Sequence, residues 1–230
     1  MLLNVSNCSQ NGNNYFGSRY LPKSNVVSFP EKKHPQETVK QHSTTAQNKP
    51  FEKVADFLLK AFHLKDVLRS GWVRIKVKQP ESVAAHSWSL GLMALTLAPS
   101  NMRLDKLLLY ALIHDLPEAD HDVGDITPYD NISSAKKFEM EDNALKKLCK
   151  DFPHIYQAWL EYAGGTTPEA RFIKQLDKLD VALQASLYAK RGHAVDDFIN
   201  YAREKLTHPD LVNMLTIVEQ KISQTNHASK

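Results

Sequence analysis

The segment from Leu104 to about Leu116 constrains the fold more than any other part of the chain. Its middle, residues 107–113, is apolar on nearly every side of a helix, and such a helix is typical of the centre of a helical bundle. The pair His114-Asp115 ends the segment. A carboxylate there is costly to bury, so it requires a cation or a proton unless the helix emerges into solvent at this point. A second His-Asp pair, at residue 121, lacks this apolar context.

Apolar residues at helical spacing predict further helices along the chain. We expect these from Phe51 to about Leu68, from Glu81 to about Ala98, from Ser134 (as N-cap) to Lys150, from His154 to Ala163, from Pro168 to Arg191, from Val195 to Leu206 and from Pro209 to Ser223. Residues 69–80 alternate apolar and basic side chains and end at a proline, which predicts an extended connection. The sequence shows no strand pair, glycine-rich phosphate loop or internal repeat. The predicted fold class is therefore all-α, with about eight helices.

The first 50 residues differ in composition from the rest. They are rich in Asn, Ser, Gln, Thr, Pro and Lys, which predicts a disordered tail before a single domain at residues 51–225. The tail carries six Lys or Arg against two Asp or Glu, and the other 180 residues carry 23 basic against 24 acidic. The excess charge of +3 therefore lies in the tail. The domain's charge balance does not favour a nucleic acid polymer as partner.

The cysteines and the hydropathy pattern bear on the compartment. Cys8 and Cys149 are too few for a disulfide framework or a Cys-based zinc site, which indicates a reducing compartment. No run approaches the roughly 20 apolar residues of a membrane span, and the N-terminus lacks the pattern of a secretion signal. We expect a cytoplasmic protein without membrane association. The nucleus, or an organelle reached through the acid-free residues 1–30 with Arg19 and Lys23, remains an alternative.

His86 is a polar residue on a predicted inward helix face. It lies three residues after Val83 and four before Leu90, which places the imidazole among apolar neighbours. A lone buried histidine also occurs as a hydrogen-bonded core residue. In the company of His114 and Asp115 it becomes a candidate metal ligand.

Asp177 is a second polar residue on an inward face, four residues after Ile173. A buried acid needs a partner. Lys174 or Lys178 can supply a salt bridge, and Asp180 competes with Asp177 as a metal ligand.

Glu118 and Asp125 follow the His-Asp pair. Glu118 lies four residues after His114, close to the same helical face, where a carboxylate can orient a ligand or move a proton. Asp125 follows Gly124, which frees the backbone to direct the side chain. Either acid can instead be a solvated loop charge.

Taken together, the chain resembles the HD-domain hydrolases, most closely their 5′-deoxynucleotidase-like branch. The matching stretches are Gly71-Trp72 and residues 79–87, 111–118, 124–128 and 172–178, in family order within residues 51–223. The resemblance implies one divalent ion (Mn, Co, Fe, Zn or Mg) held by His86, His114, Asp115 and Asp177, because the Lys-Gln context favours Asp177 over Asp180. It also implies a homodimer.

The resemblance further implies an activity, the release of the 5′-phosphate from deoxynucleoside monophosphates by metal-activated water. The substrate is then a small-molecule nucleotide. Glu118 and Asp125 match the two acids that handle protons and position the water or the leaving oxygen.

Two residues match or replace family substrate contacts. Trp72 matches a tryptophan that packs against the sugar, where a 2′-hydroxyl would clash, although a tryptophan in this place can also be a core anchor. Some relatives have an Arg immediately before the Trp, where this chain has Gly71. Arg69 is the expected replacement for phosphate binding, with Arg74 as the alternative.

The chain also departs from the family pattern. Five residues, 119–123, separate Glu118 from Gly124 where relatives have three, which leaves the position of Asp125 open. The inserted Asp120-His121-Asp122 forms either a second metal site or a solvated loop. Alternative functions are an HD hydrolase of nucleoside triphosphates or guanosine tetraphosphate, and a non-catalytic, metal-stabilised helical binding protein.

Overall fold

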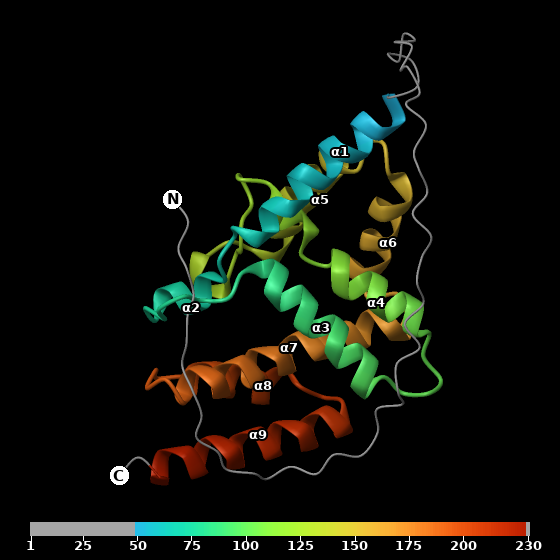
Figure 1. The fold of residues 1–230 in the computed structure, drawn as a ribbon. Coiled ribbons are helices and arrows are strands. Elements are labelled where there is room, and N and C mark those ends of the chain that lie inside the picture. The colour runs from blue at the N-terminus through green and yellow to red at the C-terminus, as the bar shows by residue number, and fades with distance from the viewer. Residues whose placement is uncertain (1–48, 229–230) are drawn as a thin grey trace, which may run out of the picture. The chain divides into compact units, whose positions relative to one another are not determined.

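The structure is a computed structural model, and it describes residues 49–228 of the chain. The described residues form nine α-helices and three short 3-10 helices without a strand (Figure 1). The all-α prediction is confirmed, with one helix more than the eight expected. The predicted tail, residues 1–50, lies almost entirely outside the described residues.

The helix bounds in the structure follow the predicted order. They are α1 (Lys49–Ala61), α2 (Ser70–Arg74), α3 (Val83–Leu97), α4 (Leu104–Ile113), α5 (Ser134–Leu148), α6 (Pro153–Ala163), α7 (Pro168–Ala189), α8 (Asp196–Lys205) and α9 (Pro209–Ala228). The 3-10 helices are η1 (Phe62–Lys65), η2 (Leu116–Ala119) and η3 (Pro128–Asp130).

Helix α4 lies among α3, α6 and α7, as its apolar sequence predicted. Leu107, Tyr110 and Ala111 are completely buried. The helix is not covered all round, because the side chain of Leu112 is 64% exposed. Since its covered faces meet three different helices, the C-terminal end of α4 is fixed in place, and this end carries the His-Asp pair.

Side-chain caps set the starts of three helices that position the site. Ser82 accepts a hydrogen bond from the backbone N–H of Ala85 at the start of α3. Thr167 does the same at α7, which has Pro168 in its first turn as expected. At α5 the predicted N-cap, Ser134, was wrong. The preceding Ser133 accepts the backbone N–H of Lys136 instead.

The prediction of an extended connection at residues 69–80 was wrong. Residues Ser70–Arg74 form the short helix α2, and Trp72 at its centre is buried. The backbone N–H of Ser70 donates to Oδ2 of Asp125, 2.6 Å away. Because this cap comes from a segment 55 residues further along the chain, the local alternation of side chains does not reveal it.

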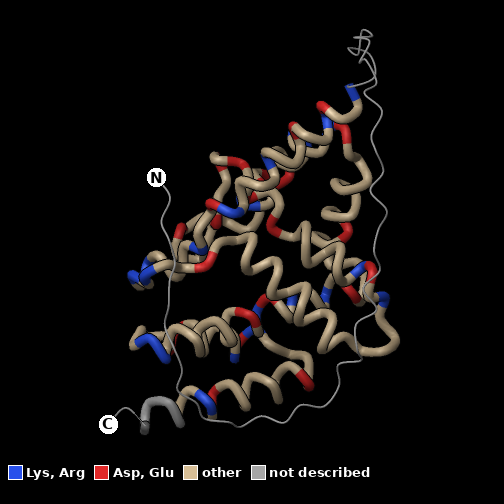
Figure 2. Tube along the Cα trace, viewed as in Figure 1, with Lys and Arg blue, Asp and Glu red and all other residues tan. Residues whose placement is uncertain are grey.

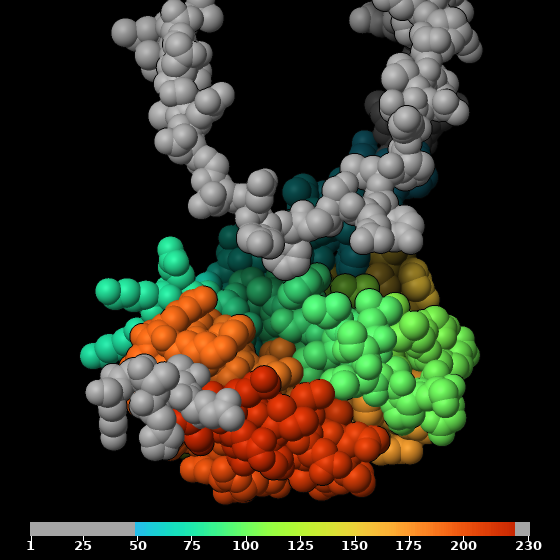
Figure 3. Space-filling model, turned by 60° about the horizontal axis from the view of Figure 1, so that its bottom comes forward, coloured from blue at the N-terminus to red at the C-terminus, as the bar shows by residue number. Residues whose placement is uncertain are grey.

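Helices α8 and α9 both pack against α7 and close one side of the bundle (Figures 1 and 3). Acidic and basic residues are interspersed along most of the described elements (Figure 2), in agreement with the balanced charge of the domain. Two segments carry one sign, since the charged side chains are all basic in residues 69–78 and all acidic in residues 115–130. None of the described helices is long and apolar enough to cross a membrane.

Candidate active site

The structure brings the four predicted metal ligands together from three helices. His86 lies on α3, His114 and Asp115 follow the end of α4, and Asp177 lies on α7. His86 Nε2 is 3.2 Å from His114 Nε2 and 3.2 Å from Asp177 Oδ1. Asp115 Oδ2 is 3.1 Å from His114 Nε2 and 3.7 Å from His86 Nε2. Both carboxylates of this four-residue cluster therefore lie near the two Nε2 atoms, and Asp115 stands outside the group of three residues whose ligand atoms all lie within 4.8 Å of one another.

The end of α4 explains how two consecutive residues reach the same point. Side chains of neighbouring residues on a helix point about 100° apart. Here the helix ends at Ile113, and Asp115 has φ −104° and ψ 15°, outside the helical range. Pro117 then lies in the first turn of η2. The indole N–H of Trp159 donates to the freed carbonyl of His114, at 3.1 Å.

The hydrogen bonds on the far side of the two imidazoles determine which nitrogen faces the cluster. His114 Nδ1 lies 3.0 Å from the carbonyl oxygen of Ala111, and His86 Nδ1 lies 2.7 Å from Asp180 Oδ2. A carbonyl and an ionised carboxylate only accept, so both Nδ1 atoms carry the hydrogen. When both rings are neutral, the two Nε2 lone pairs then face each other, and a cation between them, either a metal ion or a proton, would relieve their repulsion.

The spacing of the donor atoms fits a divalent ion. Imidazole nitrogen and carboxylate oxygen bind such ions at about 2.0–2.2 Å, so neighbouring ligand atoms at about 90° lie about 3 Å apart. The closest separations observed are 3.1 and 3.2 Å. Ligand atoms of His86, His114 and Asp177 all lie within 4.8 Å of one another. Two imidazoles and two carboxylates form a mixed donor set that several divalent metals accept.

The charges of the cluster shift the pKa values of its members. Burial and the Arg69 guanidinium oppose protonation of His86, but hydrogen bonds to Asp177 and Asp180 outweigh them and raise its pKa to about 9. Burial also opposes ionisation of Asp115, yet His114 and Arg69 hold its pKa well below the ordinary value. The cluster is thus arranged to hold positive charge among its carboxylates.

Arg69 lies beside the ligand cluster. Its Nη1 is 2.9 Å from Asp125 Oδ1 and 3.4 Å from Asp115 Oδ2, and its Nη2 is 4.0 Å from Asp177 Oδ1. Burial opposes the charge, but Asp125, Asp115 and Asp177 prevail and raise the pKa of Arg69 above its ordinary value. A permanent cation with a fork of donors therefore stands next to the candidate metal ligands.

Asp125 connects the loop after η2 to the start of α2. Besides its contacts with Arg69 and with the backbone N–H of Ser70, its carbonyl accepts the hydroxyl hydrogen of Ser70 at 2.9 Å. The preceding Gly124 has φ +59°, a left-handed conformation that favours glycine. The structure thus places Asp125 against the guanidinium of Arg69, and each of its carboxylate oxygens accepts a hydrogen bond.

Glu118 is the most isolated charged group of the site. It is 1% exposed, and its Oε2 has no hydrogen-bond partner among the described residues. Burial, with Asp115 and Asp125 adding to it, raises the pKa of Glu118 well above the ordinary value. The free oxygen is available to a water, an ion or a substrate.

Lys137 and Glu141, on α5, are site residues that the sequence did not indicate. Lys137 Nζ lies 3.9 Å from Glu118 Oε1 and 3.4 Å from Glu141 Oε1, and it donates to the carbonyl of Ile126 at 2.9 Å. On an amphipathic helix rich in charges they resemble any solvated pair at i and i+4. No sequence signal separates them from their neighbours.

Trp72 is 3% exposed in the core. Its indole N–H donates to Glu81 Oε1 at 2.8 Å, and its ring centroid lies 4.9 Å from that of Tyr188 and 4.1 Å from that of Phe198. These contacts support the alternative of a core anchor. The sugar contact stays a prediction.

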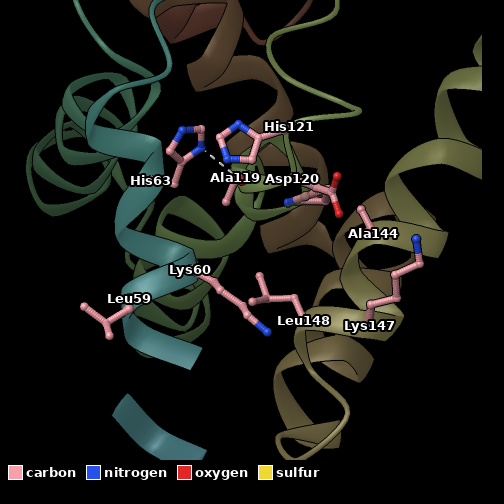
Figure 4. Close-up of a pocket in the computed structure, with 10 residues that line it drawn as sticks. Leu59, Lys60, His63, Ala119, Asp120, His121, Ala144, Lys147 and Leu148 are labelled. Atoms are coloured by element: carbon pink, nitrogen blue, oxygen red, sulfur yellow. Dashed lines mark hydrogen bonds between the residues drawn. The ribbon is translucent and has the colours of Figure 1, made fainter. Parts of the chain in front are cut away.

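The inserted loop borders a cavity of about 530 Å³ on the other side of η2 (Figure 4). The imidazoles of His63 and His121 lie side by side there, with ring centroids 4.0 Å apart. None of the four predicted metal ligands lines this cavity. Among the described residues, the groups of three or more close ligand atoms all contain His86. The structure therefore does not bring Asp120, His121 and Asp122 together as a metal site.

Comparisons with known proteins agree with this geometry. The family model described as HD domain matches residues 61–211. The human protein named 5′-deoxynucleotidase HDDC2 is 35% identical over 181 residues, covering 75% of this chain and 87% of that protein. The 5′-deoxynucleotidase hdd1 of Schizosaccharomyces pombe is 29% identical, covering 74% and 91%. A crystal structure of a Pyrococcus horikoshii OT3 protein superimposes with a TM-score of 0.61 at 30% identity, covering 74% and 99%. The chain belongs to the HD domain family of metal-dependent phosphohydrolases.

Proposed function

We propose that this protein is a 5′-deoxynucleotidase that releases the 5′-phosphate from deoxynucleoside monophosphates. The observation that carries the proposal is the convergence of two imidazole nitrogens and two carboxylates beside a half-buried guanidinium. A metal cluster next to a fixed cation suits a phosphate ester, whose oxygens need neutralising charge. The names of the human and yeast relatives support the choice of substrate.

His86, His114, Asp115 and Asp177 are proposed to hold one divalent ion. When bound, such an ion neutralises charge on the phosphate and lowers the pKa of a coordinated water. Mn, Co, Fe, Zn and Mg all remain compatible with this donor set.

Arg69 is proposed to bind the phosphate. Its planar fork offers several N–H donors, and its neighbours hold the side chain in place. Asp125 is proposed to act on the reaction by orienting Arg69 and the start of α2, which is narrower than the water-positioning role that the family pattern suggested. The two hydrogen bonds from its carboxylate support this role.

Glu118 is proposed to hold and move a proton at its free Oε2. Its burial and its raised pKa suit a carboxyl group that can hold a proton and release it to a reacting group. Trp72 is proposed to form a wall of the sugar site and to favour deoxyribose. Trp72 lies on α2, the short helix that begins directly after Arg69, and this position supports the role.

A panel of phosphate-release assays tests the proposal. It compares deoxy- and ribonucleoside monophosphates with nucleoside triphosphates and guanosine tetraphosphate, each with several divalent metals, beside the Glu118→Ala variant. We expect the highest kcat/KM with a deoxynucleoside monophosphate and a large loss in the variant. Metal binding without phosphate release from any compound would instead identify a metal-stabilised binding protein.

We also propose a homodimer, supported by an exposed apolar stripe on α3. Trp88, Leu92 and Leu95 recur at i, i+4 and i+7 and are 67%, 47% and 57% exposed. A contiguous apolar surface of this kind is typical of an interface. Light scattering after size exclusion should show a dimer that Leu92→Glu dissociates, while Leu187→Glu, at an exposed leucine on α7, leaves it intact. A wild-type monomer would contradict the proposal.

The proposed location is the cytoplasm, supported by the two cysteines and by the absence of a membrane span among the described helices. Fractionation of cells that express the full chain tests it. Recovery in a membrane or organelle fraction would contradict it.

A further inference from the structure

The candidate metal ligand His86 is held from behind by a second carboxylate. Asp180 lies on α7, three residues after Asp177, and is 4% exposed. Its Oδ2 is 2.7 Å from His86 Nδ1, while Asp177 Oδ1 is 3.2 Å from His86 Nε2. One helix therefore supplies a carboxylate to each nitrogen of the same imidazole.

We propose that Asp180 is a positioning residue that fixes the ring orientation and the tautomer of His86 for metal binding. This proposal rests on the metal site proposed above. A neutral imidazole carries one hydrogen, and only the nitrogen without it can bind a metal. The carboxylate of Asp180 keeps that hydrogen on Nδ1, so the Nε2 lone pair faces His114 and Asp177.

The two histidines of the site are supported in different ways. His114 Nδ1 meets a backbone carbonyl of its own helix, that of Ala111. His86 depends on a side chain from another helix, 94 residues along the chain. A single substitution can therefore remove the support of His86, whereas no side-chain substitution removes the support of His114.

The surroundings of Asp180 indicate a role other than stability. Among the described residues its ion-pair partner is His86 alone. A second carboxylate, Glu81, has a ligand atom within 4.8 Å of those of His86 and Asp180, and it already accepts the indole N–H of Trp72. Asp180 is buried and Glu81 half-buried, and neither forms a salt bridge to a Lys or Arg of the described residues, which is unfavourable for folding. A cation bound to His86 would offset the negative charge of these two carboxylates.

The test measures metal affinity, with Co²⁺ as the probe. We expect Asp180→Asn to weaken Co²⁺ binding about 10- to 100-fold in a competition titration with a chromogenic chelator. The visible spectrum of bound Co²⁺ should change as well, because the ring orientation changes. Asp180→Glu keeps the carboxylate and should recover part of the affinity. If Asp180→Asn does not fold, Asp180→Glu and the wild type carry the comparison.

A matched control lies on the same helix. Glu169 is also buried, at 8% exposure, and its carboxylate accepts the backbone N–H of Arg103 at 3.1 Å. Glu169→Gln removes a buried charge from α7 outside the metal cluster. Its Co²⁺ affinity should equal that of the wild type, and thermal unfolding of the metal-free proteins shows whether each variant folds.

A double-mutant cycle separates positioning from a general structural effect. If Asp180 acts through His86, Asp180→Asn should change the residual Co²⁺ affinity of the His86→Ala protein by less than about 2-fold. Wild-type affinity in Asp180→Asn, or an equal loss without His86, would overturn the proposal. Phosphate release is a separate readout, because its absence with intact Co²⁺ binding contradicts the proposed activity and leaves Asp180 in its role.

Discussion

Nη1 of Arg69 lies 2.9 Å from Oδ1 of Asp125, and the same nitrogen lies 3.4 Å from Oδ2 of Asp115. One guanidinium thus joins the loop after η2 to the end of α4. The other oxygen of Asp125 holds the first residue of α2 through the N–H of Ser70. The guanidinium next to the candidate metal ligands is therefore fixed by its two carboxylate partners and by its place directly before α2.

Replacing Arg69 with lysine should weaken phosphate binding. Lysine keeps the charge but loses the planar fork, in which Nη1 contacts Asp125 and Asp115 while Nη2 lies 4.0 Å from Asp177 Oδ1. The loss of hydrogen bonds to charged groups is worth about 1.5–3 kcal/mol. We expect the inhibition constant of inorganic phosphate and the KM for a deoxynucleoside monophosphate to rise at least about 10-fold.

Arg74 provides the control for this variant. It is the last residue of α2, the short helix that begins directly after Arg69, and its guanidinium lies over the ring of Tyr129, 3.4 Å from the centroid. Arg74→Lys should leave phosphate inhibition within about 3-fold of the wild type, because surface cation–π contacts are weak. A larger effect at Arg74 than at Arg69 would show that Arg74, and not Arg69, binds the phosphate.

Replacing Glu118 with glutamine should remove proton transfer and leave metal binding in place. General acid–base groups contribute typically 10²- to 10⁴-fold, so we expect kcat to fall by about this amount. Glutamine preserves the shape of the side chain at a fully buried position. Metal content and kcat, measured on one preparation, check the prediction, and unchanged kcat would exclude a proton-transfer role.

The same variant should make the metal-free protein more stable. Burial raises the pKa of Glu118 in the folded protein. Ionisation of this carboxyl group therefore opposes folding once the pH rises above its pKa in the unfolded chain, about 4.3. Glu118→Gln abolishes that cost, which for an unsatisfied buried group is about 1–3 kcal/mol. We expect a Tm about 2–8 °C higher than wild type near pH 8. The difference in Tm should be smaller near pH 5. Calorimetry of both proteins at the two pH values, with a chelator present, measures it.

The sequence predicted much of the site because its positions follow helix geometry. The periodicity of Val83 and Leu90 placed His86 on a buried face, and both neighbours are completely buried. Pro117 indicated the helix end at which His114 and Asp115 converge. The preference for Asp177 over Asp180 came from the family pattern, and periodicity alone gave no reason for it.

Other features depend on contacts that no local pattern encodes. Helix α2 starts at a backbone N–H bonded to Asp125, which is distant in sequence. Asp180 was weighed as a ligand, and the structure places it behind His86, because its position depends on how α3 meets α7. Lys137 shares its charge pattern with every exposed turn of α5, so only the fold distinguishes it.

Replacing Trp72 with phenylalanine should reduce both stability and discrimination between sugars. The indole N–H donates to Glu81 Oε1, and its loss leaves a half-buried acceptor unpaired, at a cost of about 1 kcal/mol. If the ring forms a wall of the sugar site, the ratio of kcat/KM for deoxy- over ribonucleotides should fall about 10-fold. A lower Tm with an unchanged ratio would show that Trp72 is only a core anchor.

Replacing His121 with alanine should leave the metal content unchanged at one ion per chain. His121 and His63 line a cavity beyond η2, and the close ligand groups among the described residues all include His86. Two imidazoles without a third ligand hold a divalent ion weakly. Metal analysis after dialysis should show one ion in the wild type and in His121→Ala, and a loss of the ion in His114→Ala. A second ion that disappears with His121 would instead make the inserted loop a metal site.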